Sequence, residues 1–217
     1  MEKQAKRNKA FYHLPGLFEF YELYRAFLPL FREHREYFYD WCEIGSIYGA
    51  PLDCIWGGGR VEDEDCHPRD VLALMQKYGI SARLTFSNSL LREEHLSDKK
   101  CNALCGLFSE NKGIQNGVII HSDLLLNYLK EKYPELYFVS STTKVLTDFE
   151  AFRNEVKRDD FRYVVPDFRL NKQFERMDTL TQIQKEKVEF LLYYMTKPEY
   201  QINVREEIYL DNMLDLF

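Results

Sequence analysis

Short apolar runs along the chain end in small polar or charged residues, and amphipathic stretches follow them. The clearest of these runs and their polar ends cover residues 82–88, 117–123, 136–142 and 163–167. Continuous apolar runs that alternate with amphipathic helices are typical of parallel strands buried on both faces of a sheet. The pattern therefore predicts βαβ units and places the polar ends at the carboxyl edge of a parallel sheet, where such folds bind ligands.

Six parallel strands are expected. They cover residues 11–16, 41–49, 82–88, 118–121, 137–140 and 163–167, with a further short extended piece at 53–56. A closed (β/α)₈ barrel has eight strands and typically about 250 residues. Six strands in 217 residues therefore predict an α/β fold that is parallel and (β/α) barrel-like. The barrel is expected to be incomplete or atypical, to remain an open sheet, or to be completed by a partner chain.

Apolar residues at three- and four-residue spacing predict helices between the strands. These helices are expected at residues 17–39, 70–78, 97–108, 124–133 and 148–158, followed by 181–194 and 204–216. Pro29 is expected to kink or restart the first helix, Gly79 to end the second, and Asp148 to begin the fifth. Because the chain contains no Pro/Gly/Ser-rich linker, we expect one domain over residues 1–217, with 181–217 as a C-terminal helical segment.

Composition narrows the class of protein. The formal net charge of −6 makes nonspecific attraction to nucleic acid unfavourable over the whole surface, although a local basic patch remains compatible with it. No apolar run approaches the roughly 20 residues needed to cross a bilayer. The five cysteines are an odd number without the spacing of a secreted disulfide framework. We therefore expect a soluble, cytoplasmic protein with reduced thiols and no membrane partner.

The polar residues at the strand ends are the candidate site. If the strands are parallel neighbours, their ends converge on one mouth that holds carboxylates, a histidine, a lysine and hydroxyl or amide groups. The candidate catalytic residues are His121, Asp167 and Lys144, and the candidate ligand-binding residues are Glu43, Arg60, Ser87, Asn88, Asp123, Ser141 and Arg169. His121 is singled out because an imidazole with a pKa near 6.5 suits acid–base chemistry.

Structural roles compete with these assignments. Ser122, Asp123 and Asn88 have the side chains that cap helices, because their oxygens accept hydrogen bonds from free backbone N–H groups. Asp167 and Arg169 have the charges of a structural salt bridge. A histidine at a buried strand end, such as His121, is more often a hydrogen-bonded structural residue than a catalytic one, and Lys144 is compatible with a simple surface position.

Two further motifs give weaker signals. The loop Gly57-Gly58-Gly59-Arg60 allows close backbone approach to an anion, but it lacks the spacing of a dinucleotide-binding or P-loop motif. Cys101 and Cys105 are one helical turn apart, and Cys66 is followed by a histidine. No second pair completes four ligands, so neither a metal site nor a cofactor is predicted.

Residues 80–90, 116–145 and 163–180, with Trp56-Gly57-Gly58 upstream, resemble the collagenase-like peptidase family. The resemblance is a pattern of strands over residues 12–190. It implies a barrel-like fold in a bacterial cytoplasmic protein, since members of that family are barrel proteins of bacteria. Several of them act in the hydroxylation of tRNA or ribosomal RNA and carry iron–sulfur clusters.

The chain departs from that family where its diagnostic cysteines are expected, downstream of residues 187–190. Leu-Leu-Tyr-Tyr-Met follows there instead, and no cysteine lies beyond Cys105. An iron–sulfur cluster held as in the relatives is therefore not expected. The junction is also consistent with a shortened version of a longer, cysteine-containing relative.

Two classes of function follow. The first is a divergent barrel of the collagenase-like type that binds a small molecule or an RNA segment at the strand ends, with no reaction assigned because no serine is paired with a histidine in the sequence. The second is a noncatalytic interaction protein, possible as a homo-oligomer, whose open barrel edge is covered by a partner or a second subunit through the aromatic segments 18–38 or 191–217.

Overall fold

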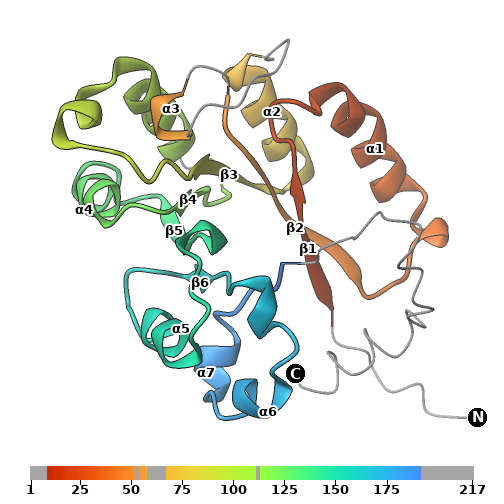
Figure 1. Cartoon of the computed structure of the whole chain (residues 1–217). Coiled ribbons are helices and arrows are strands. Elements are labelled where there is room, and N and C mark those ends of the chain that lie inside the picture. The colour runs from red at the N-terminus through yellow and green to blue at the C-terminus, as the bar shows by residue number, and fades with distance from the viewer. Residues whose placement is uncertain (1–8, 52–53, 58–66, 111–112, 192–217) are drawn as a thin grey trace, which may run out of the picture.

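The computed structural model describes residues 9–51, 54–57, 67–110 and 113–191. Six parallel strands form one sheet in the order β1-β2-β3-β4-β5-β6, which curls into a half-barrel (Figure 1). The strands are β1 (Ala10–Pro15), β2 (Cys42–Gly49), β3 (Ser81–Phe86), β4 (Gly117–Ile120), β5 (Tyr137–Ser140) and β6 (Tyr163–Val164). The expected parallel, incomplete barrel is confirmed, and each strand pairs with its neighbour in sequence.

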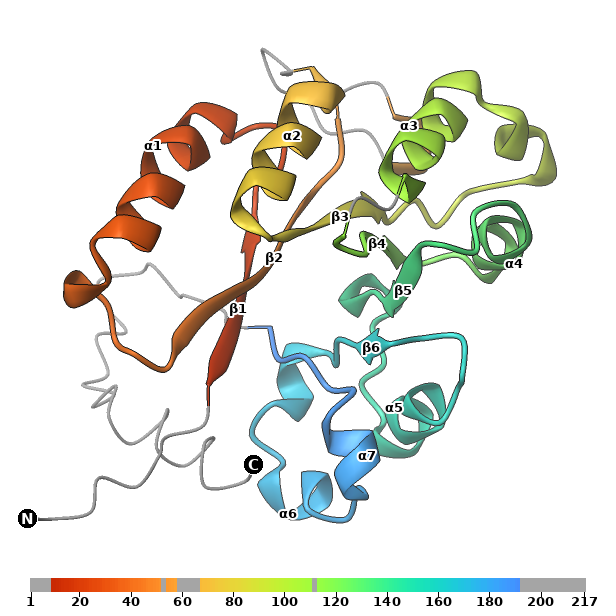
Figure 2. The ribbon, with the colours of Figure 1, turned by 180° about the vertical axis from the view of Figure 1, so that it is seen from behind.

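Helices connect the strands on the outside of the curled sheet, and Figure 2 shows α1 beside α2 and the cluster of α5, α6 and α7 at the β6 end. The α-helices are α1 (Tyr21–Glu33), α2 (Pro68–Tyr78), α3 (Lys99–Ser109), α4 (Asp123–Lys132), α5 (Phe149–Val156), α6 (Phe174–Met177) and α7 (Gln182–Lys185). The short 3₁₀ helices are η1 (Arg35–Tyr37), η2 (Ile55–Gly57), η3 (Glu93–Ser97), η4 (Thr142–Lys144) and η5 (Phe168–Leu170).

Local signals set several helix ends as expected. Gly79 ends α2 in the left-handed conformation at φ 72°, and the Asp148 side chain accepts a hydrogen bond from the backbone N–H of Ala151 at the start of α5. Pro29 lies inside α1, which continues to Glu33, so the expected restart of that helix is wrong. The buried face of α1 outweighs the one backbone hydrogen bond that a proline removes.

Two further expectations are corrected. The extended piece expected at residues 53–56 is the 3₁₀ helix η2 over its described part. The helix expected at 181–194 is the single turn α7 among the residues that the structure describes. Val188 then forms a parallel bridge with Val164 of β6, and backbone hydrogen bonds flank the bridge on both sides. Sheet pairing has replaced helix there, and the expected helix at 204–216 lies outside the described residues.

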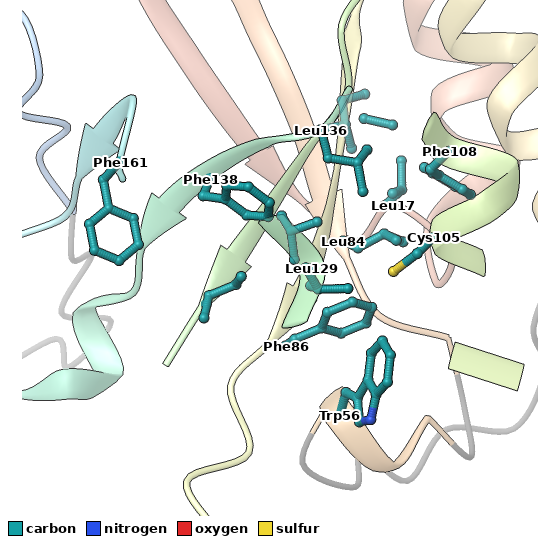
Figure 3. Packing of buried hydrophobic residues seen from close by; sticks show 14 of the residues in the cluster. Leu17, Trp56, Leu84, Phe86, Cys105, Phe108, Leu129, Leu136, Phe138 and Phe161 are labelled. Atoms are coloured by element: carbon teal, nitrogen blue, oxygen red, sulfur yellow. The ribbon is translucent and has the colours of Figure 1, made fainter. Parts of the chain in front are cut away.

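The hydrophobic core lies between the sheet and the helices. The side chains of Leu84, Phe86, Val118 and Ile120 are fully buried on this side. Trp56 of η2 packs edge-on against Phe86, with ring centroids 5.3 Å apart, and Figure 3 shows these two rings together beneath Leu129 of α4. Since successive side chains of a strand point to opposite faces, Arg83 and Thr85 face away from this core and into the half-barrel.

Candidate functional site

The ends of the parallel strands meet at one edge of the sheet, which we call the rim. Backbone hydrogen bonds join the residues that follow neighbouring strands: His121 donates to the Phe86 carbonyl at 3.2 Å, and Ser141 donates to the Ile120 carbonyl at 3.0 Å. Val165 donates in the same way to the Ser140 carbonyl at 3.1 Å. The sequence-based placement of the polar strand ends along a common edge is therefore confirmed for β3 to β6.

His121 is joined to the end of β5 by a chain of side-chain contacts. Its Nδ1 lies 3.0 Å from Thr143 Oγ1, and that hydroxyl lies 2.8 Å from Ser141 Oγ. Burial, followed by the nearby Lys144 ammonium, lowers the pKa of His121, which favours the uncharged imidazole. Two of the sequence candidates, His121 and Ser141, are thus brought together, and Thr143 is a neighbour that the sequence reasoning missed.

The turn that carries Thr143 ends in an unusual backbone conformation. Val145 follows η4 at φ 54° and ψ 47°, in the left-handed region, and its side chain is exposed. A β-branched residue is rare in this conformation because its side chain crowds the backbone. The strained residue directly follows the turn that holds Thr143 against His121, and strain of this kind clusters at ligand and active sites.

The ammonium group of Lys144 is engaged by carboxylates and does not point freely from the rim. Its Nζ lies 2.7 Å from Glu155 Oε1 and 3.3 Å from Asp123 Oδ1, and it sits over the Phe161 ring. Ser140 Oγ also donates to Glu155 Oε1, at 2.6 Å. Burial tends to raise the pKa of Glu155, but the hydrogen bonds from Lys144 and Ser140 outweigh it and lower the value. Lys144 therefore joins the rim to the helix layer through a structural ion pair.

Asp123 is the first residue of α4, and the preceding Ser122 caps the helix by accepting a hydrogen bond from Leu125 N. The Asp123 carboxylate pairs with Arg158 Nη1 at 3.0 Å in addition to Lys144. These two cations lower the pKa of Asp123, against the opposing effect of burial. Capping, expected for both residues, is made by Ser122, while Asp123 belongs to the ion-pair network.

Asp167 and Arg169 lie together after β6. Asp167 Oδ1 accepts a hydrogen bond from Arg169 N at 3.0 Å and so caps η5, and the Arg169 guanidinium lies 3.5 Å from the same oxygen. Asp167 is buried and Arg169 is exposed. The salt bridge considered from the sequence is present, and β6 pairs only as far as Val164 rather than reaching Asp167.

Ser87 and Asn88 follow β3 and hold the η2 segment. Ser87 Oγ donates to the Gly57 carbonyl at 3.3 Å, and Asn88 Nδ2 donates to the Ile55 carbonyl at 2.7 Å. Asn88 Oδ1 accepts from Leu90 N at 2.9 Å, a local turn rather than a helix cap. Both candidate ligand residues are on the rim, and both are engaged in positioning a neighbouring loop.

Two candidate ligand residues are not placed on the rim. Glu43 is the second residue of β2 and pairs with Lys9 at 2.8 Å, so it lies near the amino end of its strand. The sequence indicated a strand, or a strand followed by a loop, over residues 41–49, and the strand continues to Gly49, so Glu43 lies at the end away from the rim. Arg60 lies outside the described residues.

The interior of the half-barrel contains a buried ion pair that the sequence reasoning missed. Arg83 of β3 binds Glu189 through its two terminal guanidinium nitrogens, Nη1 to Oε2 at 2.6 Å and Nη2 to Oε1 at 2.7 Å. Its Nε donates to Tyr137 OH at 2.8 Å, and the guanidinium lies over the Tyr137 and Tyr163 rings. Arg83 is 2% exposed. The pair joins the middle of the sheet to the segment that follows α7.

His13 of β1 extends this cluster. Its Nδ1 lies 2.7 Å from Ser46 Oγ, and its Nε2 lies 3.3 Å from Glu189 Oε1. The pairing of β1 with β2 shifts register next to His13, and the imidazole lies over Gly45, where an added Cβ would approach it to 2.6 Å. Burial, reinforced by Arg83 and opposed by Glu189, lowers the pKa of His13 to about 4.

These residues form a polar layer across the half-barrel, made of His13, Arg83, Tyr137 and Glu189. A closed (β/α)₈ barrel fills its interior with layers of side chains from alternate strands, and branched apolar residues dominate them. The layer here likewise draws on β1, β3 and β5, but it is held by hydrogen bonds and charge. Above Arg83 on the same face, the Thr85 hydroxyl is buried and makes no hydrogen bond within the described part of the chain.

The chain Ser46–His13–Glu189 has the residue types of a nucleophile, a base and an orienting acid. Two features oppose that role. Ser46 is fully buried, and both oxygens of Glu189 are already bound by Arg83. The neutral imidazole can accept a proton, but no substrate carbonyl reaches the serine, so the arrangement is a structural hydrogen-bond chain.

Two searches of the described residues, for a metal-binding group and for a membrane-spanning helix, found none. Within them, no group of three or more histidine, cysteine, aspartate or glutamate side chains is arranged to hold a metal ion. In the same part of the chain, the helices are too short or too polar for any of them to span a bilayer.

Comparison with known proteins shows a similarity of fold to a solved structure. The fold is similar to that of the solved structure of the U32 peptidase Mk0906, with a TM-score of 0.51 and 16% sequence identity. The match covers 88% of this chain and 70% of that chain. No protein-family model matches the sequence. No curated protein matches it either. The similarity supports the barrel-like architecture, which is also the architecture implied by the resemblance to the collagenase-like family.

Proposed function

We propose that the half-barrel binds a small polar ligand at the rim, against the group formed by His121, Thr143 and Ser141. The observation that carries this proposal is the left-handed Val145, which follows the turn that sets Thr143 against His121. Holding a β-branched residue in this conformation lowers the free energy of unfolding, and strained residues of this kind cluster at ligand sites. At one point of the rim a ligand would meet the imidazole of His121, which can donate or accept a hydrogen bond, and the hydroxyls of Thr143 and Ser141.

The rim favours an uncharged or weakly charged ligand over a nucleic acid. Lys144 and Arg158 are each paired with more than one carboxylate, and Arg169 faces Asp167. Binding to a phosphate backbone depends on cations that are available to replace counterions. These paired cations and the formal net charge of −6 make an RNA segment the weaker choice of ligand.

A thermal-shift screen tests the proposal. The full chain is titrated with a panel of amino acids, sugars, nucleosides and short carboxylic acids, and with a single-stranded RNA oligonucleotide. We expect a small polar compound to raise the melting temperature of the wild type, and the shift to be lost in His121→Ala and Thr143→Val. The matched control is His34→Ala on the exposed segment after α1, which leaves the shift unchanged.

Two results would contradict it. A ligand whose shift survives both rim substitutions places binding elsewhere. A response only to RNA that weakens steeply with salt assigns binding to a basic surface instead. Because His121 is only partly buried, His121→Ala is expected to keep the melting temperature of the free protein within a few degrees of wild type, which separates loss of binding from loss of folding.

The second candidate function is association through β1, whose outer edge has no strand partner among the described residues. Phe11 on this strand is 61% exposed, and Tyr37 and Tyr39, which lie between α1 and β2, are also exposed. An uncovered edge strand beside exposed aromatic side chains is a common interaction surface. Light scattering at micromolar concentration tests this function: a dimer that dissociates in Phe11→Lys supports it, and a monomeric wild type contradicts it.

A further inference from the structure

Two buried thiols meet beside the rim. The Sγ atoms of Cys54 and Cys101 lie 3.0 Å apart, although the residues are separated by 47 positions in the sequence. Cys54 directly precedes η2, Cys101 lies in the first turn of α3, and both are free and buried. An S–S bond is about 2.05 Å long, so an approach of roughly 1 Å brings the two sulfurs to bonding distance.

The surroundings give the two thiols different roles. The hydrogen bond from the Cys101 thiol is the largest influence on Cys54 and lowers its pKa, with further help from the backbone N–H groups of Gly57 and Trp56. The same hydrogen bond raises the pKa of Cys101. Of the two sulfurs, Cys54 is therefore the one that more readily loses its proton to give the thiolate, the form that reacts with oxidants, and Cys101 is its resolving partner.

The segment that carries Cys54 is tied to the rim. The Trp56 indole donates to the His95 carbonyl at 2.8 Å, and the Trp56 carbonyl accepts from Asn88 N at 3.2 Å. Ser87 and Asn88 also bind the carbonyls of this segment through their side chains. A covalent bond at Cys54 therefore fixes η2 to α3 and, through η2, restrains the rim residues that follow β3.

We propose that Cys54 and Cys101 are a modification site at which a peroxide oxidises the dithiol to an intramolecular disulfide. The Cys54 thiolate attacks one oxygen of hydrogen peroxide, the O–O bond breaks, and a Cys54 sulfenic acid and water form after proton uptake. The Cys101 sulfur then attacks the sulfenic sulfur, loses its proton and displaces hydroxide, which leaves as water. Two thiols and one peroxide thus give one disulfide and two waters. This inference does not depend on the proposed ligand.

The competing explanation is that the cysteines are small packing residues. Cys105 provides the internal comparison, because it lies one turn beyond Cys101 on α3, is equally buried, and has a pKa raised first of all by burial. Cys42 provides a more exposed comparison on β2. If burial alone determined reactivity, Cys101 and Cys105 would behave alike and Cys42 would be oxidised first.

The experiment uses the full chain treated with hydrogen peroxide, alkylated under denaturing conditions and digested for mass spectrometry. We expect a peptide pair joined through Cys54 and Cys101, a mass loss of two hydrogens, and a melting temperature raised by roughly 5–10 °C and restored by dithiothreitol. Cys54→Ser and Cys101→Ser each abolish the linked pair, whereas Cys42→Ser leaves it in place. The wild-type peptide map alone decides the question if a serine variant does not fold.

Three results overturn the proposal. The first is that Cys54 and Cys101 are still recovered as alkylated thiols at a peroxide concentration that oxidises Cys42. Alternatively, Cys54 is oxidised to sulfinic acid without a linked peptide, which means that Cys101 does not resolve the sulfenic acid. Finally, the linked peptides join a different pair, such as Cys101 with Cys105 or Cys54 with Cys66.

Discussion

Arg83 and Glu189 form a two-pronged ion pair across the half-barrel although 106 positions separate them in the sequence. The guanidinium comes from the middle of β3, and the carboxylate comes from the segment that pairs with β6 through Val188. The ion pair therefore occupies the inside of the half-barrel, where a closed barrel would have a layer of apolar side chains. Arginine stays protonated at any pH that a folded protein tolerates, so the charge inside the half-barrel is permanent.

Removing the carboxylate is expected to destabilise the protein strongly. Glu189→Gln keeps the side-chain shape but leaves the Arg83 charge buried without a counterion, which costs about 3–5 kcal/mol of unfolding free energy. Urea unfolding followed by circular dichroism measures the loss. Glu186→Gln, on the exposed surface after α7, is the matched control and is expected to change the free energy by less than about 0.5 kcal/mol.

A double substitution separates the ion pair from its packing. In Arg83→Met/Glu189→Leu no charge remains buried, so the protein is expected to lose less stability than Glu189→Gln alone. The single variants Arg83→Met and Glu189→Leu are measured beside it. If the double variant lost as much unfolding free energy as the two single variants together, the side chains would contribute independently and their ion pair would add little to stability.

The low pKa of His13 makes part of the stability dependent on pH. The folded-state pKa of about 4 lies below the ordinary value of 6.5, so the unfolded chain binds the proton more readily. The contribution of His13 is complete above about pH 6.5 and is lost progressively as the pH falls towards 4. Between about pH 7 and pH 5 this loss amounts to about 2 kcal/mol.

His13→Gln is expected to remove that part of the pH dependence. The free energy of unfolding is measured in urea at both pH values for the wild type, His13→Gln and the exposed control His34→Gln. The wild type and the control are expected to lose stability in parallel, with His13→Gln falling less by about 2 kcal/mol. Equal slopes for all three proteins would mean that His13 is protonated in the folded state at the same pH as in the unfolded chain.

The order of the strands and the position of the rim were predictable because they follow from local patterns. Each apolar run was long enough to indicate a strand, and each polar end marked the residue after which pairing stops. Chain order then determined neighbours, because consecutive strands of βαβ units lie side by side. The same reasoning put His121 and Ser141 among the residues at one edge of the sheet, but it could not foresee that Glu155 would bind Lys144 from the helix layer.

The polar layer was missed for a physical reason. Arg83 and Thr85 alternate with Ala82, Leu84 and Phe86, and this alternation indicates a strand with one polar face. The run was instead interpreted as a strand buried on two apolar faces. Even the correct interpretation of β3 leaves the counterion unknown, since a partner 106 positions away depends on how far the sheet curls.

Substitution at Val145 tests whether backbone strain is stored at the rim. Glycine adopts the left-handed conformation without steric cost, so Val145→Gly is expected to stabilise the protein by about 1 kcal/mol. Val145→Ala is the matched control, because it removes the branched side chain but keeps a Cβ in the same backbone conformation. Thermal and urea unfolding are expected to rank the proteins with glycine above alanine and alanine at or above valine.

The ranking also connects strain to binding. If the left-handed turn positions Thr143 for a ligand, Val145→Gly loosens that position, so the ligand-induced rise in melting temperature becomes smaller while the free protein becomes more stable. A glycine variant that is less stable than wild type would indicate that the exposed Val145 side chain contributes packing that outweighs the strain.

Gly117 tests the packing of the polar layer at its tightest point. An added Cβ at this first residue of β4 lies 2.5 Å from the Tyr137 ring, the same ring whose hydroxyl binds Arg83 and Ser81. Gly117→Ala therefore has to displace the ring and its hydrogen bonds, and we expect a loss of about 2–4 kcal/mol in urea unfolding. Gly106→Ala in α3 is the matched control, because its Cβ finds its nearest neighbour at 3.9 Å and alanine favours a helix by about 0.5–1 kcal/mol. If Gly117→Ala were as stable as Gly106→Ala, the Tyr137 ring would be free to move, and the hydrogen bond between Tyr137 and Arg83 would not be needed to hold the layer together.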